Sequence, residues 1–306
     1  MAKAEPRRKF ALVTGASSGI GHSLAKEFAT KGYQVIACSP ANVVHLHEDL
    51  VENHGAVSLA CDITNAEDLL LLKKRVLEET GGYLDVLYNN AGVAYGASSI
   101  EMDEDKLDRL FQVNVLGHIN VTKQLAPLVI NAKGSIVFTS SIAARVPLAW
   151  TSVYSATKAA IDAYARTLHG EMAPFGVRVH SVITGGVQTA ISGNLAEKEL
   201  KKEIEGSVYD VDGALECLVA TNRMSMNSKC TPDEYARDMV AQVTEKPNKF
   251  NLYGGFRCLL LNFMSRYFPL WLMESLVQRK FKQQVVFQNV EKFVRARDAD
   301  NRKIFE

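Results

Sequence analysis

The sequence predicts an α/β fold: a doubly wound parallel sheet of about seven strands, flanked by helices and followed by an amphipathic helical extension. Two observations predict it. Short apolar segments alternate with helical ones, which is typical of a parallel sheet covered on both faces. The first apolar segment also runs directly into a glycine-rich turn that opens a helix. We therefore expect one domain over residues 8–255 and an apolar, then charged, helical tail over 256–306.

The elements follow in a regular order. Residues 10–31 contain the first strand, the turn and the first helix. Further strands are expected at 33–39, 56–62, 84–92, 134–140, 177–186 and 249–255. Helices are expected from a Thr64 or Asn65 cap to about Glu79, after Asp103 to about Ile130, and at 152–173, and residues 192–246 read as helical with breaks.

Composition and charge exclude several classes of protein. Hydrophobic residues make up 47% of the 306, enough for a sizeable core. Because 35 basic residues balance 34 acidic ones, the sequence indicates no surface for nucleic acid. The five cysteines are scattered, and the N-terminus is too short and polar for a signal peptide. We therefore expect an intracellular protein with neither disulfides nor a metal site.

The first turn reads TGASSGIG, in which Gly15, Gly19 and Gly21 follow the pattern T-G-x-x-x-G-x-G. Glycine permits a tight turn and lets the backbone approach a pyrophosphate, which the N-terminus of the following helix attracts. Between a strand and a helix, this pattern predicts a dinucleotide site.

A serine, a tyrosine and a lysine are the candidates for the chemistry. Ser141 follows an apolar strand, and Tyr154 and Lys158 are four residues apart, so on a helix they share one face. A phenol with a pKa of roughly 10 is a poor acid at neutral pH, but a neighbouring ammonium lowers that pKa. The trio suits proton transfer to or from the oxygen of a carbonyl or an alcohol.

Taken in order, TGASSGIG, NNAG at 89–92, Asn114 in FQVNVLG, Ser141 and Tyr154-x-x-x-Lys158 resemble the short-chain dehydrogenase/reductase family, whose fold is of the Rossmann type. The resemblance covers about residues 8–255. Segments such as LDVLYNNAG and YSATKAAI resemble, more narrowly, the fungal NADPH-dependent 1-acyldihydroxyacetone phosphate reductases.

The resemblance implies a role for each matching residue. Tyr154 is then the general acid/base, and Lys158 lowers its pKa and also binds the nicotinamide ribose. Ser141 orients the substrate oxygen, and Asn114 helps to hold a water that continues the proton relay. A purely structural role for Asn114, as a polar residue that bends its helix, stays open.

The resemblance also implies contacts to the cofactor. They fall on Gly15, Ser17, Gly19, Ile20 and Gly21 in the first turn, Ser39 after the second strand, Asp62 at the adenine ring, Asn90 beside the adenine ribose, Tyr154 and Lys158 at the nicotinamide ribose, and Val187 and Thr189 at the carboxamide. Asp62 can equally cap the next helix. Thr184 stands where the family usually has proline, which puts some rigidity of that loop in doubt.

Ser39 bears on which nicotinamide cofactor binds. NAD-specific relatives carry an acidic residue here, which would repel a 2′-phosphate, and Ser39 does not. NADP-specific relatives usually carry arginine next, but Pro40 follows, and CSPANVV contains no basic residue. Ser39 and Asn42 can still hydrogen-bond a phosphate. The missing carboxylate and the narrower resemblance favour NADP(H).

The start of the tail is apolar but interrupted by Asn262, Arg266 and Pro269, so it lacks the ~20 consecutive apolar residues of a membrane-spanning helix. Its aromatic residues and flanking basic residues suit a segment that lies on a membrane or lipid droplet. We therefore expect the protein at the surface of the endoplasmic reticulum or of lipid droplets, and otherwise in the cytoplasm. A lid over the substrate pocket or a dimer contact is the alternative, and residues 289–306 are expected to form a solvated helix.

These observations favour an NADPH-dependent reductase of a lipophilic ketone, with 1-acyldihydroxyacetone phosphate as the best-resembled substrate. The alternative is a relative that reduces a ketone or oxidises an alcohol of a fungal polyketide or terpenoid, which Pro40 and the segment ARVPLAW favour. A nucleotide-sensing protein without activity is a third reading, but such proteins usually lose Tyr or Lys of the motif. The sequence does not fix the oligomeric state, although in most members of the resembled family the helices that match 103–130 and 152–173 pair between subunits of a homo-oligomer.

Overall fold

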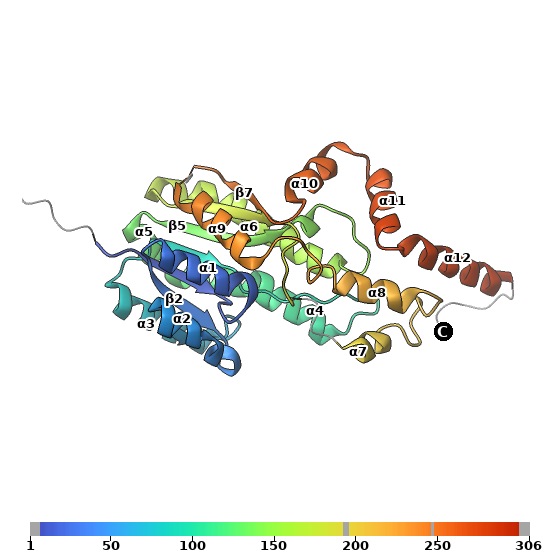
Figure 1. Cartoon of the computed structure of the whole chain (residues 1–306), viewed down its shortest axis with the longest axis horizontal. Helices are drawn as coiled ribbons and strands as arrows, with labels where there is room; N and C mark the ends of the chain where they lie inside the picture. Colours follow the sequence, from blue (N-terminus) through green and yellow to red (C-terminus); the bar gives the residue numbers. More distant parts are fainter. Residues whose placement is uncertain (1–6, 192–195, 246–247, 300–306) are drawn as a thin grey trace, which may run out of the picture.

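A computed structural model describes residues 7–191, 196–245 and 248–299. One seven-stranded sheet organises the chain (Figure 1), with the strand order β3-β2-β1-β4-β5-β6-β7. All neighbouring strands run parallel. The expected doubly wound α/β fold is therefore confirmed. Because the strand order reverses between β1 and β4, ligands are expected to bind at the carboxyl ends of these two strands.

Each strand lies within one of the expected ranges or within one residue of it, and β3, β4, β6 and β7 are two or three residues shorter at one or both ends. The strands are β1 Phe10–Thr14, β2 Gln34–Ser39, β3 Val57–Ala60, β4 Val86–Asn89, β5 Ser135–Ser141, β6 Arg178–Thr184 and β7 Asn251–Gly254. Nearly every side chain of β1, β4, β5 and β6 is buried, as expected for a sheet that is covered on both faces.

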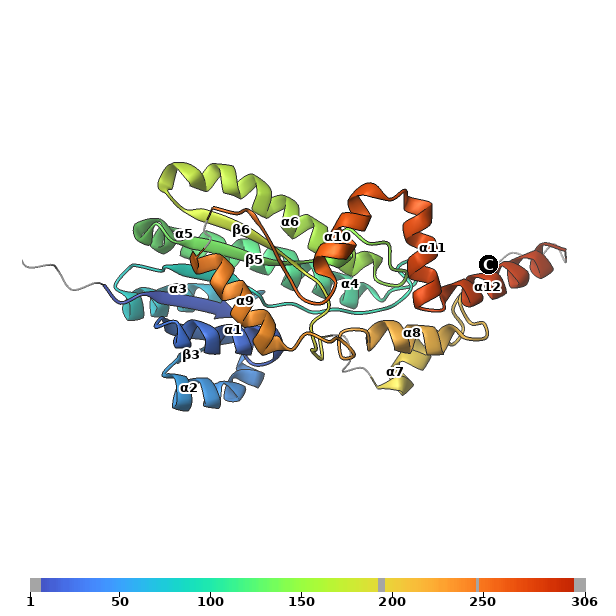
Figure 2. The ribbon, with the colours of Figure 1, turned by 45° about the horizontal axis from the view of Figure 1, so that its top comes forward.

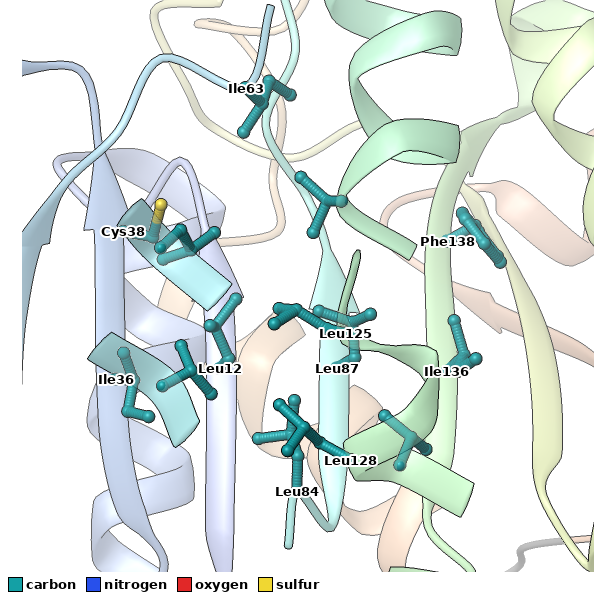
Figure 3. Close-up of a cluster of buried hydrophobic side chains, with 14 of the residues drawn as sticks. Leu12, Ile36, Cys38, Ile63, Leu84, Leu87, Leu125, Leu128, Ile136 and Phe138 are labelled. Carbon is teal, nitrogen blue, oxygen red and sulfur yellow. The ribbon is translucent and has the colours of Figure 1, made fainter. Parts of the chain in front are cut away.

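Helices cover both faces of the sheet. One face carries α1 Gly19–Thr30, α2 Glu48–His54 and α9 Pro232–Glu245, and the other carries α3 Ala66–Thr80, α5 His118–Ala132 and α6 Ser152–Met172. Figure 3 shows the second interface, where Leu12 and Leu87 of the strands lie beside Leu125 and Leu128 of α5. These buried apolar contacts hold the carboxyl ends of the strands in fixed positions.

Two segments differ from the expected elements. The link between β2 and β3 is not a plain connection, because it contains a short 3₁₀ helix, η1 (Ala41–His47), and then α2. The long helix expected over 103–130 consists of α4 Glu104–Phe111, a π-helical turn at Gln112–Gly117 (η2), and α5.

Asn65, rather than Asp62, caps α3, since its side chain accepts hydrogen bonds from Glu67 N and Asp68 N.

Beyond β6 the chain forms a cap at one end of the molecule (Figure 2). The cap contains α7 Glu197–Lys202 and α8 Ala214–Asn222 from the variable segment, and α12 Gln283–Ala299 from the tail. An apolar cluster joins them, made of Trp150, Leu200, Ile204, Ala214, Cys217, Leu218 and Val286. We call this group the cap cluster. Residues 192–195, within the expected helical stretch, lie outside the described residues.

The tail packs against the rest of the chain at its start and again at the first turn of α12. Gly186 and Phe256 exchange backbone hydrogen bonds of 3.2 and 2.7 Å, so close contacts cross the expected boundary at residue 255. The first turn of α12 is buried through Gln283 and Val286, whereas residues 291–297 are mostly exposed, in line with the solvated helix expected there. Between these ends lie α10 Cys258–Tyr267 and α11 Leu270–Lys280. In the described part of the chain, every helix is too short or too polar to cross a membrane.

Candidate active site

The glycine turn after β1 is packed too closely for side chains. A Cβ on Gly21 would lie 2.0 Å from Gly15 O, and one on Gly15 would lie 2.8 Å from the Cα of Ala91. Gly15 and Gly19 also have φ values of +68° and +54°, in the left-handed region that glycine adopts readily. The turn therefore exposes backbone at the N-terminus of α1, which is the shape and the polarity that a pyrophosphate requires.

Thr14, which the sequence analysis did not single out as a site residue, joins this turn to the end of β4. Its Oγ1 accepts hydrogen bonds from Asn90 N at 3.0 Å and from Ala91 N at 3.1 Å. The Asn90 side chain returns a bond to Thr14 O at 3.1 Å. The amide of Asn90 thus joins the end of β1 to the loop that follows β4, and its contact with a ribose stays a prediction.

Ser17 and Ser39 meet on the outer side of the same turn. Ser17 N donates to Ser39 Oγ at 3.0 Å, and Ser39 is almost fully buried. Asp62, at the end of β3, accepts bonds from Thr64 N at 2.9 Å and from Thr64 Oγ1 at 2.7 Å. Burial alone would raise the pKa of Asp62, but the bonds from Thr64 and the nearby Arg109 together lower it. Asp62 is therefore a fixed carboxylate at the predicted adenine position.

The loop after β6 meets the glycine turn from the opposite side. Thr189 lies so near Gly19 that a Cβ there would be 3.3 Å from its methyl carbon. Val187 is buried. Thr184 replaces the usual proline, and its hydroxyl lies 2.7 Å from the hydroxyl of Tyr235, while Gly186 is paired with Phe256. These contacts supply the rigidity that the missing proline put in doubt.

Helix α6 presents Tyr154 and Lys158 on one face, as its four-residue spacing predicts. Lys158 is 2% exposed, and its Nζ donates to Thr139 O at 2.9 Å. Burial lowers the pKa of Lys158 to about 8, so the amine still carries a proton at neutral pH. The Nζ lies 5.8 Å from the centre of the Tyr154 ring.

The electrostatics of Tyr154 differ from expectation. Burial raises the pKa of the Tyr154 phenol, and a hydrogen bond with Ser141 acts in the opposite direction. The expected lowering by Lys158 is not found, because the lysine is turned toward the carbonyl of Thr139. Ser141 and Tyr154 nevertheless bring two hydroxyl groups together, which suits the binding of one substrate oxygen between them.

Asn114 lies in the π-helical turn η2 and is fully buried. Its Oδ1 accepts from Val93 N at 2.9 Å, while its Nδ2 donates to Val93 O at 2.9 Å and to Thr157 Oγ1 at 3.1 Å. Single π-helical turns inside α-helices are frequent at functional sites. Here the turn lets Asn114 join the exit of β4 to the catalytic helix α6, and its part in a proton relay stays a prediction.

His118 is a residue near the site that the sequence analysis missed. It is fully buried at the start of α5, and its Nε2 lies 2.7 Å from Ala91 O. Burial and the nearby Lys158 lower the pKa of His118 to about 3, so the ring stays neutral and donates to that carbonyl. The four-residue spacing from Asn114 would have placed it on the same side of the helix.

The fold and this constellation can now be compared with known proteins. A family profile described as short chain dehydrogenase matches residues 9–200. The chain is a short-chain dehydrogenase. It is therefore an oxidoreductase, and the resemblance read from its motifs is confirmed.

Relatives of this short-chain dehydrogenase cover nearly its whole length. It is 37% identical over 280 residues to the NADPH-dependent 1-acyldihydroxyacetone phosphate reductase of Saccharomyces cerevisiae, covering 90% of this chain and 92% of the relative. It is also 37% identical over 281 residues to the short-chain dehydrogenase fogD of Aspergillus ruber, with 89% and 93% covered. Among solved structures, a short-chain dehydrogenase from Streptomyces avermitilis superposes with a TM-score of 0.70 at 26% identity, covering 95% and 99% of the two chains.

We predict that Tyr154→Phe lowers kcat by about 10²–10⁴-fold, the usual contribution of a general acid, and leaves cofactor binding nearly unchanged. The reason is that the substitution removes only the hydroxyl beside Ser141. Tyr164→Phe, on the same helix but packed against Phe138, is the matched control. A Tyr154→Phe enzyme that keeps more than about a tenth of the wild-type kcat would exclude Tyr154 as the proton donor.

Proposed function

We propose that this short-chain dehydrogenase uses NADPH to reduce the ketone of a lipophilic substrate to a secondary alcohol, with 1-acyldihydroxyacetone phosphate as its substrate. When bound, the nicotinamide supplies the hydride. Tyr154 gives its phenolic proton to the carbonyl oxygen, and Ser141 holds that oxygen beside it. Lys158 and Asn114 hold the groups that return a proton to Tyr154.

The cap cluster is the observation that carries the proposed substrate class. Trp150, four residues before Tyr154, is buried in it and has a φ of +63°, which a bulky residue adopts only where its surroundings hold it. Its ring makes edge-to-face contacts with Tyr209 at 5.8 Å and Phe287 at 6.3 Å. The cap cluster therefore includes a residue four positions before Tyr154, and its apolar side chains are of the kind that bury an acyl chain.

Two further observations support the particular substrate and cofactor. The yeast reductase, whose name gives both NADPH and 1-acyldihydroxyacetone phosphate, is similar over 90% of this chain. No carboxylate stands at Ser39, so nothing at that position repels a 2′-phosphate. The name of the yeast reductase supports the acyl ketone phosphate as substrate, and the missing carboxylate supports NADPH as cofactor.

The test is NADPH oxidation by the purified enzyme against a matched set of ketones. The set contains 1-acyldihydroxyacetone phosphates of several chain lengths, the same ketones without phosphate, and polyketide and terpenoid ketones. We expect the highest kcat/KM for the long-chain phosphate esters. Equal or higher kcat/KM for a polyketide or terpenoid ketone would contradict the proposed substrate and favour the alternative.

We also propose that α10 and α11 lie on an anionic lipid surface. Their apolar side chains are exposed: Leu259, Leu260, Phe263, Tyr267, Phe268, Leu270 and Trp271. We call these residues the tail patch. Exposed basic residues adjoin it, namely Arg257, Arg266, Arg279, Lys280 and Lys282, and Glu274 is the single acidic residue between 256 and 282. Apolar burial combined with attraction to anionic headgroups is how amphipathic helices bind membrane surfaces.

This proposal predicts that the full chain sediments with vesicles of mixed phosphatidylcholine and phosphatidylserine, and less with phosphatidylcholine alone. The double variant Leu259→Ser, Trp271→Ser should stay in the supernatant. Leu71→Ser is the control, because Leu71 of α3 is 61% exposed but lies outside the patch. A wild-type protein that stays in the supernatant would contradict the proposal. A double variant that changes the oligomeric state, with no change in sedimentation, would assign the patch to a subunit interface.

A further inference from the structure

A histidine lies directly behind the residue that ends β2. His47 is the last residue of η1 and is 1% exposed. Its Nε2 lies 2.9 Å from Ser39 Oγ, and its Nδ1 lies 2.8 Å from Ser58 Oγ on β3. A chain of three polar groups therefore runs from β2 through η1 to β3. Because no local sequence pattern predicts η1, these three residues cannot be connected from the sequence.

The hydroxyl of Ser39 has a definite set of partners. It accepts a bond from Ser17 N at 3.0 Å and donates its one hydrogen to Cys38 O at 2.8 Å. The bond to His47 must then be donated by the imidazole Nε2, which leaves Nδ1 to accept from Ser58. In this arrangement the ring is neutral, and it can take a second proton at Nδ1 if Ser58 turns its hydrogen away.

The end of β2 is where this fold receives the adenosine ribose. The 2′-phosphate of NADPH brings about two negative charges to that point. From Ser39 to Leu46 the sequence has neither lysine nor arginine. The imidazole of His47, in contact with Ser39, is thus a basic group next to the position where other NADP-binding proteins have an arginine for the 2′-phosphate.

We propose that His47 is the specificity-determining cation for the 2′-phosphate, and that it acts through Ser39. The inference rests on the proposed use of NADPH. When the phosphate arrives, His47 takes one proton from solvent at Nδ1. The imidazolium then donates to both serines, and the hydrogen of Ser39 is released from Cys38 O to bind a phosphate oxygen. His47 positions Ser39 and supplies charge, and it has no part in the chemical step.

The groups around His47 keep its imidazole neutral until the 2′-phosphate binds. Burial lowers the pKa of His47, and His22 on α1 lowers it further. The Nε2 of His22 lies 3.2 Å from Asp49 Oδ2 on α2. The carboxylate of Asp49 is therefore paired with His22. Ser39 faces the ring from β2 and Ser58 faces it from β3. A bound phosphate dianion raises the pKa of His47 by direct attraction.

Protonation of His47 makes the affinity for NADPH depend on pH. The contribution of His47 to NADPH affinity is present below the pKa of the complex and is lost as pH rises through it, whereas NADH lacks the contribution at every pH. The 2′-phosphate has its own pKa near ~6 and loses charge below it. A histidine variant retains the titration of the ligand, so the difference between wild type and variant isolates His47.

The experiment is calorimetric titration of the full-length protein with NADPH and NADH, and with 2′,5′-ADP and 5′-AMP, between about pH 6 and pH 8.5. Each titration is repeated in two buffers of different ionisation enthalpy, which gives the number of protons taken up. His47→Gln keeps a hydrogen-bonding group without a titrating one. His45→Gln is the matched control, because His45 lies on the same helix but is exposed.

For His47→Gln we expect about tenfold weaker binding of NADPH and 2′,5′-ADP near pH 6.5, as for the loss of one charge-assisted hydrogen bond. The binding of NADH and 5′-AMP should change less than about twofold, and proton uptake should fall to the level set by the phosphate itself. Ser58→Ala, which removes the partner of Nδ1, should reduce the proton uptake as well. His45→Gln should match wild type.

Three results would overturn the inference. One is an unchanged ratio of NADPH to NADH affinity in His47→Gln, with proton uptake intact. Another is an equal loss for both cofactors, which would make His47 a structural support of the ribose site. The third is a wild-type protein that does not prefer NADPH, and this result would overturn the proposed cofactor as well.

Discussion

The close approach of the first turn to the end of β4 is the constraint on which the rest of the site depends. Gly15 has no room for a side chain against the backbone of Ala91, and Thr14 Oγ1 binds the two backbone amides that follow β4. Both loops leave the sheet where its strand order reverses. A dinucleotide can bind across this point only because the backbones on either side are fixed relative to each other.

The same junction positions Asn114 and Lys158, two of the residues proposed for the chemistry. A Cβ on Gly92 would lie 3.4 Å from Asn114 Oδ1 and 3.6 Å from Lys158 Nζ, so the exit of β4 contacts both. Asn114 in turn contacts α6 through Thr157. A buried charge without a hydrogen-bond partner is strongly unfavourable. The amine of Lys158 can be buried because it donates to the carbonyl of Thr139. The glycine turn, Asn114 and helix α6 therefore form one connected unit.

Sequence patterns predicted the sheet, the glycine turn and the face shared by Tyr154 and Lys158, because each depends on short-range geometry: strand alternation, glycine spacing and helical periodicity. What they missed depends on contacts between distant segments. The helix η1, which places His47 against Ser39, is stabilised by packing on β2 and β3. The cap combines Trp150 with Val286, 136 residues later, and no local pattern in the charged end of the tail signals that contact.

The measurement that tests the connected unit most directly is NADPH affinity, by calorimetry, in Thr14→Val. This substitution leaves the amides of Asn90 and Ala91 without their acceptor, at about 1–3 kcal/mol for each. Thr80→Val is the control, because Thr80 is also buried and hydrogen-bonded but lies at the end of α3. The account predicts that Kd rises at least about tenfold in folded Thr14→Val and is unchanged in Thr80→Val. A wild-type Kd in Thr14→Val would contradict it.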